Sequence, residues 1–454
     1  MTKPLKSVHL TNYYHKNSGG ISTAYNKLLE AANRRERFVR LIVPGEKQEI
    51  EEVGEFGRIY YVPALQSPVF DKRYRILLPW QYMSEDTIIR SILAAEMPDI
   101  IEIGEKYALS LLAGMIHKGH LKALNRPMLV HFTCERMDDN INAFIGDSKA
   151  LKWFARRVTG NYIFPMFDFH LANSHYTAQE LFDAVGYADN PQPSNAFFNF
   201  CWRYFRAATV PIKERVFVNQ CGVDIQSFSI ERRSDEFRRQ ITKNHDLPEN
   251  AALLLYAGRI SPEKNIQLLV DLMKVLAKDT DKNYYLLVAG AGPKADWLKK
   301  QSELLGGNKI IFLGHFDKET LANYYANSDV FVHPNPREPF GIAPLEAMAS
   351  GTPVLVPNSG GLLSYATDEN AWLAEPTAEN FAAGIRDILT NAERRDKKIS
   401  QAYETSRNFS WEHSTDQLFA TYDKLHEDFK QRNKFFSDEA ASRDFNFAEL
   451  LSYK

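Results

Sequence analysis

Short apolar runs alternate with longer stretches of helical spacing along most of the chain. In the first half, the apolar runs predict strands at residues 7–11, 39–43, 58–62, 99–103, 128–132, 169–172 and 215–219. Patterns with a repeat of three to four residues predict helices between them, at residues 21–32, 86–95, 109–117 and 175–182. Strands that alternate with helices are typical of βαβ units, in which the strands form a parallel sheet.

A second series of the same kind begins near residue 253. It predicts strands at residues 253–257, 285–289, 309–313, 330–333 and 354–357, and helices at residues 266–277, 294–304, 318–326 and 344–350. The polar stretch 227–250 separates the two series, although its composition would suit a charged surface helix equally well. We therefore expect an α/β chain of two Rossmann-like, doubly wound domains at residues 1–226 and 227–410. A charged helical segment, 411–454, follows and either packs back on the first domain or forms a plain surface helix.

Length, charge and cysteine content agree with this organisation and narrow the class of protein. The chain has 454 residues, more than the about 250–300 at which a single core stops growing. Its 55 Lys and Arg residues nearly balance 57 Asp and Glu residues, so no nucleic-acid partner is expected. Cys134, Cys201 and Cys221 are too scattered for a disulfide framework or a cysteine metal site. Because neither a signal peptide nor an apolar run of membrane-spanning length is apparent, we expect a cytoplasmic protein.

Two positive side chains follow the first strand of the second series. The chain turns at Gly258, and Ser261 with Pro262 is expected to cap and open a helix. Arg259 and Lys264 flank that helix end, so both can reach one diphosphate at the carboxyl edge of the sheet, where open α/β sheets bind ligands. The alternative is that both are solvated surface charges.

Two glutamates lie around the start of a later helix. Glu338 is in a proline-rich loop after a strand, and Glu346 is about one turn inside the helix that Gly341 begins. A loop carboxylate can hold sugar hydroxyls, and a carboxylate inside the helix can hold a ribose diol. The free N–H groups of Gly341, Ile342 and Ala343 would meet a phosphate. The alternative is a capped helix with two incidental acids.

These segments resemble the retaining glycosyltransferases of family 4, the glycosyl transferases of group 1. The resemblance rests on Gly-Arg-Ile-Ser-Pro-Glu-Lys-Asn at 258–265, Glu-Pro-Phe-Gly-Ile-Ala-Pro-Leu-Glu at 338–346 and Ser-Gly-Thr-Pro at 350–353. It implies the GT-B fold, with two Rossmann-like domains facing across a cleft and a C-terminal helix that crosses back. The implied activity is transfer of a hexose from a UDP- or GDP-linked sugar to a hydroxyl acceptor, such as a glycan or lipid-linked glycan of cell-envelope polysaccharide synthesis. A sugar-nucleotide epimerase and a non-catalytic nucleotide-sugar-binding protein are the alternatives.

The resemblance also implies roles for particular residues. Arg259 and Lys264 would stabilise the leaving diphosphate, Glu338 would lie near the transferred sugar and Glu346 near the ribose. Further donor-binding positions are Gly290, His315 and Phe316 near the base, and Phe340, Gly341, Ile342 and Ala343 between the two glutamates. The family mechanism is a same-face substitution in which the departing phosphate helps to deprotonate the acceptor. No cofactor is expected and no metal ion, because Arg and Lys take the place of a cation.

The first domain is expected to hold the acceptor. Gly19 and Gly20 lie between the first strand and the first helix, where the family has a glycine-rich loop, although a tight turn would explain them as well. His131 ends a strand and corresponds to a family histidine near the donor sugar, while a strand-end histidine alone is more often structural. The family often continues with a second His or an Asp. This chain has Thr133, Cys134 and Glu135, of which Glu135 is a weak candidate for the acceptor site.

An aromatic and basic segment at residues 195–206 has no counterpart in the family pattern. Its Trp202, Tyr204, Phe205 and Arg206 would suit a membrane interface or a lipid-linked acceptor. A buried helix or an oligomer contact is the more common explanation for such a run, and we favour it. Peripheral attachment at the inner face of the membrane through this segment is the other interpretation.

Overall fold

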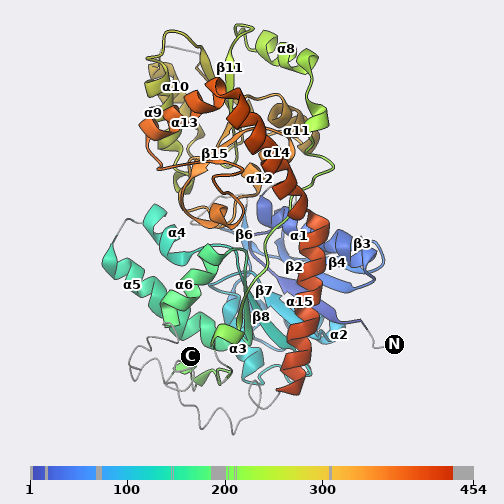
Figure 1. The fold of residues 1–454 in the computed structure, drawn as a ribbon. Coiled ribbons are helices and arrows are strands. Elements are labelled where there is room, and N and C mark those ends of the chain that lie inside the picture. Colours follow the sequence, from blue (N-terminus) through green and yellow to red (C-terminus); the bar gives the residue numbers. More distant parts are fainter. Residues whose placement is uncertain are drawn as a thin grey trace. The chain divides into compact units, whose positions relative to one another are not determined.

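The chain folds into two compact units (Figure 1). The computed structural model describes residues 4–15, 19–67, 74–144, 146, 148–185, 201–202, 204–208, 210, 212–305 and 309–432. The first unit consists of Met1–Gln220 with Ser414–Lys454, and the second of Cys221–His413. Residues 221–226, which we predicted at the end of the first domain, are part of the second. There the N–H of Val223 donates to the carbonyl of Phe409 at 2.7 Å, and the N–H of Trp411 donates to the carbonyl of Val223 at 3.2 Å.

The first unit is built on an eight-stranded sheet in the order β10-β9-β8-β7-β1-β2-β4-β3. The strands are β1 (Lys6–Leu10), β2 (Phe38–Gly45), β3 (Glu49–Val53), β4 (Gly57–Pro63), β7 (Ile100–Ile103), β8 (Met128–Thr133), β9 (Phe169–Ala172) and β10 (Val216–Val218). All pairs are parallel except β3 with β4. The seven predicted strands are present. Within this sheet, β3 was not predicted, because its Glu-Ile-Glu-Glu-Val sequence lacks an apolar run.

The helices of the first unit are α1 (Gly20–Arg34), α2 (Ile88–Glu96), α3 (Ser110–His117), α4 (Met137–Phe144), α5 (Lys149–Val158) and α6 (His175–Val185). β5 (Leu65–Gln66) and β6 (Arg75–Ile76) form a second, two-stranded sheet. Short helical turns are η1 (Pro79–Gln81), η2 (Thr159–Ile163), η3 (Phe164–Met166) and η4 (Ile212–Glu214). Four of the helices were predicted; α4 and α5 were not.

Helix α15 (Trp411–Gln431), drawn in red in Figure 1, returns to the first unit. Phe419, Tyr422, Leu425 and Phe429 recur at helical spacing and are buried in the same core cluster as residues of α1 and β2. The Tyr422 hydroxyl donates to the buried Glu102 carboxyl, which also contacts His9 at 2.9 Å. At the rim, Arg35 Nε donates to Asp416 at 2.9 Å. The helix therefore completes the core of the first unit.

The second unit contains a six-stranded, fully parallel sheet in the order β13-β12-β11-β14-β15-β16. Its strands are β11 (Ala252–Ala257), β12 (Tyr284–Ala289), β13 (Ile310–Gly314), β14 (Val330–Val332), β15 (Val354–Pro357) and β16 (Trp372–Ala374). Its helices are α8 (Asp235–Asn244), α9 (Ile266–Leu276), α10 (Ala295–Leu304), α11 (Lys318–Ala326), α12 (Ile342–Ala349), α13 (Ala378–Thr390) and α14 (Ala392–Asn408), with turns η5 (Ile230–Arg232), η6 (Pro262–Lys264) and η7 (Gly361–Ser364).

Burial on both faces explains why the central strands are continuously apolar. All six residues of β11 are buried, and alternate ones enter two separate core clusters. Such strands occur in parallel sheets with helices on both faces. The polar stretch at 227–250 is different, because it forms η5 and α8, with Ser234 capping α8 by accepting the N–H of Phe237. Over the described residues, no helix combines the length and apolar character that crossing a membrane requires.

Candidate active site

The carboxyl ends of β11 and β14 bring Lys264 and Glu338 together. These strands are neighbours in the sheet of the second unit, so the loops that leave them meet at one edge. Lys264 Nζ donates to both carboxylate oxygens of Glu338, each at 2.8 Å. Asn265, in the left-handed conformation with φ 52°, donates from Nδ2 to the carbonyl of Pro334 at 2.9 Å, which ties the two loops a second time.

The local structure around Lys264 differs from the predicted capped helix. Residues 262–264 form the short turn η6, and α9 begins only at Ile266, after the left-handed Asn265. Ser261 accepts no capping hydrogen bond, and its hydroxyl donates to Glu263 instead. Pro262 therefore begins only the single turn η6, because the left-handed backbone of Asn265 separates this turn from helix α9.

Glu338 is a buried carboxylate with several donors. His333 Nε2 lies 3.1 Å and Asn335 Nδ2 2.9 Å from its Oε2. Burial alone would raise the pKa of Glu338, but the charge of Lys264 and the contact with His333 hold it far below the usual range. The carboxylate is therefore ionised at any physiological pH. Sequence reasoning missed His333 and Asn335, although both stand within five residues of Glu338.

A glycine pair after β15 supports the loop that carries Glu338. Gly361 N–H donates to the Glu338 carbonyl at 2.7 Å. A Cβ at Gly361 would lie 1.8 Å from the carbonyl oxygen of Pro339, and one at Gly360, where φ is 80°, would lie 2.8 Å from the carbonyl oxygen of Pro336. Only glycine fits this close approach. The Gly-Gly dipeptide at 360–361 is a signal that the sequence contained and that we did not use.

Helix α12 starts at the same edge of the sheet. Gly341 precedes it with φ 86°, and its carbonyl accepts the Tyr365 hydroxyl. Phe340 is 2% exposed and packs on Tyr365 and Phe409, at centroid distances of 5.4 and 6.3 Å. Phe340 therefore anchors the helix start from the core, while Ile342 at the first turn stays partly exposed.

Glu346 lies on α12 with a carboxyl group that titrates near neutrality. The Tyr325 hydroxyl donates to its Oε2 at 2.9 Å. Burial raises the pKa of Glu346 to about 7, partly offset by Tyr325 and by the charge of Lys318. Lys318 is held at 2.9 Å by Asp224, whose negative charge acts in the raising direction.

Gly290 brings the loops after β11 and β12 into direct backbone contact. It has φ 151°, and a Cβ there would lie 1.9 Å from the carbonyl oxygen of Gly258. The N–H of Gly290 donates to the Gly314 carbonyl at 2.7 Å, so the loop with exposed His315 is joined to it. Phe316 is stacked on Tyr324 with centroids 4.9 Å apart. Arg259 is partly exposed beside Gly258, in the loop that this packing positions.

In the first unit, the glycine loop and the histidine lie in different environments. Gly19, with φ 97°, and Gly20 are exposed at the start of α1, and Gly19 needs glycine for this backbone angle. His131 on β8 has no exposed surface and lies against Phe167 and His170, the two Nδ1 atoms of the histidines 3.3 Å apart. Burial lowers the pKa of His131 well below its ordinary value. This geometry favours the structural explanation of His131.

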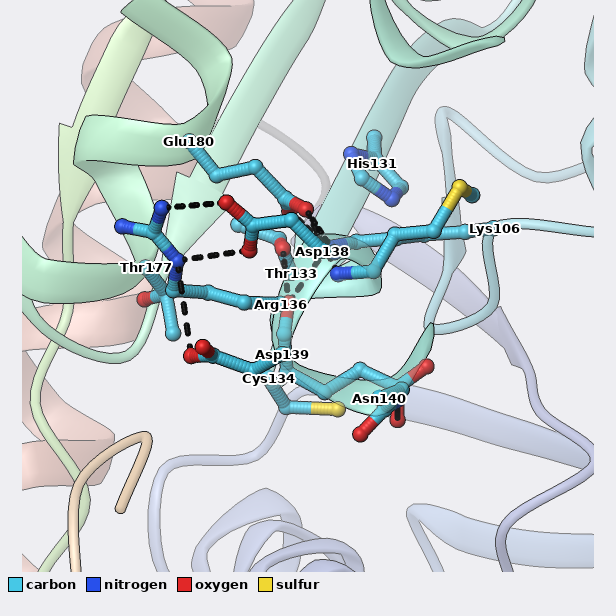
Figure 2. Close-up of polar contacts among 12 residues, drawn as sticks. Lys106, His131, Thr133, Cys134, Arg136, Asp138, Asp139, Asn140, Thr177 and Glu180 are labelled. Atoms are coloured by element: carbon cyan, nitrogen blue, oxygen red, sulfur yellow. Dashed lines mark hydrogen bonds and ion pairs between the residues drawn. The ribbon is translucent and has the colours of Figure 1, made fainter. Parts of the chain in front are cut away.

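A polar cluster follows β8 next to His131 (Figure 2). Lys106 and Glu180 are both 1% exposed and form an ion pair at 2.5 Å, and Glu180 also accepts the N–H groups of Met137 and Asp138 at the start of α4. In the same loop, Glu135 accepts hydrogen bonds from the Tyr13 hydroxyl and from Asn140 Nδ2, both at 2.7 Å. Glu135 remains partly exposed, so its carboxylate is held in place yet accessible.

The aromatic segment at 195–206 is described only in part, since residues 195–200 and Arg203 lie outside the described residues. Trp202 is fully buried, donates from Nε1 to the Gly160 carbonyl at 3.0 Å and is stacked on Phe164. Trp202 therefore belongs to the core of the first unit and cannot enter a membrane surface.

Comparisons with known proteins agree on one kind of enzyme. Residues 237–405 match the family described as glycosyl transferases group 1. The chain is 26% identical over 421 residues, 92% of its length and 96% of the relative's, to the GDP-mannose-dependent alpha-(1-6)-phosphatidylinositol dimannoside mannosyltransferase of Mycobacterium tuberculosis. It is 31% identical over 234 residues, 48% of its length and 50% of the relative's, to a D-inositol 3-phosphate glycosyltransferase of Nocardioides.

Solved structures share the fold over 93% of the chain. HepE of Anabaena, in complex with UDP and glucose, superposes with a TM-score of 0.65 over 93% of this chain and 100% of that one, at 17% identity. Sucrose-phosphate synthase of Thermosynechococcus elongatus gives a TM-score of 0.67 over 93% and 100%, at 19% identity. At these identities the likeness describes the fold.

Proposed function

We propose that this chain, which belongs to the glycosyl transferases of group 1 and has the GT-B fold, moves a hexose from a nucleotide-diphosphate sugar to a hydroxyl acceptor with retention of configuration. GDP-mannose is the first donor to test, because the relative aligned over 92% of the chain is named for it. A glycan or glycolipid is the acceptor class that we propose. Attachment to the inner face of the membrane is part of the same proposal.

The observation that carries this proposal is the placement of Lys264 and Glu338 beside the start of α12. Two of the three N–H donors of Lys264 go to Glu338, which leaves one for a phosphate oxygen. Arg259, five residues earlier in the same loop, carries a planar guanidinium whose geometry suits phosphate oxygens. Together with the N–H groups at the start of α12, these cations would stabilise negative charge on a leaving diphosphate. We propose that they make a metal ion unnecessary.

The surroundings of Glu338 support a same-face substitution over a double displacement. A carboxylate nucleophile must be free to attack, as in retaining glycosidases. Glu338 instead shares its oxygens among Lys264, His333 and Asn335. Such a group suits hydrogen bonding to sugar hydroxyls. We propose that it positions the transferred sugar, and that Glu346 binds the ribose.

A donor screen followed by a transfer assay tests the proposal. A nucleotide sugar that binds the native state raises the melting temperature in proportion to its saturation. The donor found in this way is then offered with glycan and glycolipid acceptors in the presence of EDTA, and the anomeric configuration of the product is read by NMR. An inverted anomer or loss of transfer in EDTA would refute the mechanism. A changed sugar nucleotide formed without acceptor would identify an epimerase instead.

A further inference from the structure

Helix α5 of the first unit exposes two large aromatic side chains next to each other. Trp153 is 59% and Phe154 54% exposed, whereas Ala155 on the opposite face is 1% exposed. Leu151 and Val158 lie on the same inner side and are partly buried. In Figure 1, α5 lies at the edge of the first unit, away from its sheet. The aromatic pair is therefore not part of the core.

The same helix is strongly basic. Its ten residues include Lys149, Lys152, Arg156 and Arg157 and contain no Asp or Glu. At about 100° per residue, Lys149, Arg156 and Arg157 surround Trp153 on the outer face. The Arg157 guanidinium lies 5.2 Å from the centroid of the Trp153 ring. The outer face of α5 thus combines an apolar centre with a positive surround.

The two acidic residues of α4, the helix that precedes α5 in the chain, are engaged elsewhere. Asp138 of α4 accepts Arg136 Nε and Nη2 at 3.0 and 2.7 Å (Figure 2). Asp139 lies 3.6 Å from Arg136 and accepts the Tyr176 hydroxyl. Over the part of the chain that the structure describes, Lys149, Arg156 and Arg157 form no ion pair.

We propose that the outer face of α5, defined by Lys149, Trp153, Phe154, Arg156 and Arg157, docks on an anionic lipid bilayer. Trp and Phe enter the boundary between headgroups and acyl chains, and Lys and Arg bind the anionic headgroups. A bilayer supplies both the apolar and the negative component over the area of one helix. This surface is formed by residues other than 195–206, and the proposed docking does not depend on the identity of the acceptor.

Co-sedimentation with vesicles tests the proposal. The wild-type protein binds vesicles of phosphatidylglycerol with phosphatidylcholine, binds weakly to phosphatidylcholine alone, and is released by salt. Each juxtamembrane cation contributes about fivefold to such binding, so Arg156→Ala/Arg157→Ala reduces it about 25-fold. Lys299→Ala/Lys300→Ala removes the same charge from exposed positions of α10 and leaves binding within a factor of about two.

The aromatic component has its own variants. Trp153→Ala/Phe154→Ala lowers vesicle binding at least tenfold, whereas Trp80→Ala, which removes another exposed tryptophan, does not. Bromine-labelled phosphatidylglycerol quenches tryptophan fluorescence in the wild type, and this quenching falls in Trp153→Phe, which keeps an aromatic side chain. Transfer to a water-soluble acceptor is unchanged in all these variants.

Two results would overturn the proposal. One is equal binding of phosphatidylglycerol vesicles by the wild type and by the α5 variants with intact folds, as checked by circular dichroism. The other is a wild-type dimer that Trp153→Ala/Phe154→Ala converts to a monomer without any vesicle binding by either protein, since the face would then join two copies of the chain.

Discussion

The ammonium group of Lys264 donates to both carboxylate oxygens of Glu338, each at 2.8 Å. The two residues are 74 positions apart in sequence and lie in loops from adjacent strands. The contact therefore forms only when the loops after β11 and β14 are both correctly placed at the edge of the sheet in the second unit. It also places one positive and one negative group next to each other at the proposed donor site.

Lys264→Ala is expected to lower kcat/KM for transfer about 10²- to 10³-fold, the usual cost of losing one donor that stabilises developing negative charge. Glu338→Gln keeps the size of the side chain but removes its charge, and it is expected to lower kcat by a similar factor. Steady-state kinetics with the donor from the screen measures both effects. Lys274→Ala, which removes an exposed lysine of α9, serves as the control. Wild-type kinetics in both site variants would contradict the site assignment.

The raised pKa of Glu346 predicts pH-dependent donor binding. If the ionised carboxylate binds the ribose, only about a tenth of the protein is competent at pH 6 and most of it is at pH 8, because the pKa is about 7. Donor affinity should therefore increase up to about tenfold between these pH values, as measured by calorimetric titration. Glu346→Gln should bind more weakly and with no such increase. A wild-type affinity that falls with pH would refute the prediction.

The raised pKa of Glu346 also predicts that the stability of the folded protein falls as pH rises, whereas donor affinity increases. Between about pH 4.5 and 7 the folded protein keeps the proton of Glu346 while the unfolded chain loses it, so stability falls as pH rises. Glu346→Gln removes this proton and should flatten that part of the melting-temperature profile. Calorimetric scans across the range compare the two proteins. A Gln variant whose profile is as steep as that of the wild type would show that other groups cause the slope.

Gly290→Ala is expected to disrupt the proposed donor site, because the added methyl group would clash with the backbone of a neighbouring loop. Its Cβ would lie 1.9 Å from the Gly258 carbonyl oxygen, so the loop with Arg259 must move. We expect a loss of donor affinity together with a lower melting temperature. Gly119→Ala is the matched control, since Gly119 also has a positive φ of 77° but has no neighbour near an added Cβ. Only the backbone strain of about 1–3 kcal/mol applies there.

Helix α15 is expected to be anchored by Tyr422 more than by its surface ion pairs. Tyr422→Phe removes the donor to the buried Glu102 and should lower the free energy of unfolding by about 1–3 kcal/mol. Asp416→Ala removes partly exposed pairs with Arg34 and Arg35 and should cost at most about 1 kcal/mol. Denaturant unfolding followed by circular dichroism compares them. A larger loss of stability in Asp416→Ala than in Tyr422→Phe would show that the surface ion pairs anchor the helix.

Burial determines how far the sequence could predict this molecule. The strands were predictable because parallel strands between two helical layers must be apolar throughout, as in β11. The segments that carry Lys264, Glu338 and Glu346 could be recognised from short local sequences, and the contact between Lys264 and Glu338 follows from the two neighbouring strands, β11 and β14, that precede them. Their roles in binding the donor stay predictions. The burial of Trp202 agrees with the explanation that we favoured for the aromatic run. The burial of His131 was not predictable, because a strand-end histidine looks the same in sequence whether it faces solvent or core. The outward aromatic pair of α5 was missed for the same reason, since neither Trp153 nor Phe154 differs in type from a core residue.

The return of α15 to the first unit has a consequence for synthesis of the protein. The core residues Phe419, Tyr422 and Leu425 leave the ribosome after the entire second unit, although the strands that they cover were made first. The second unit, whose residues are continuous in sequence, can complete its core during translation. The first unit must wait with a partly uncovered apolar surface, and at about 5–20 residues per second the delay is roughly ten to forty seconds. A nascent chain of this protein should therefore depend on chaperones during that interval.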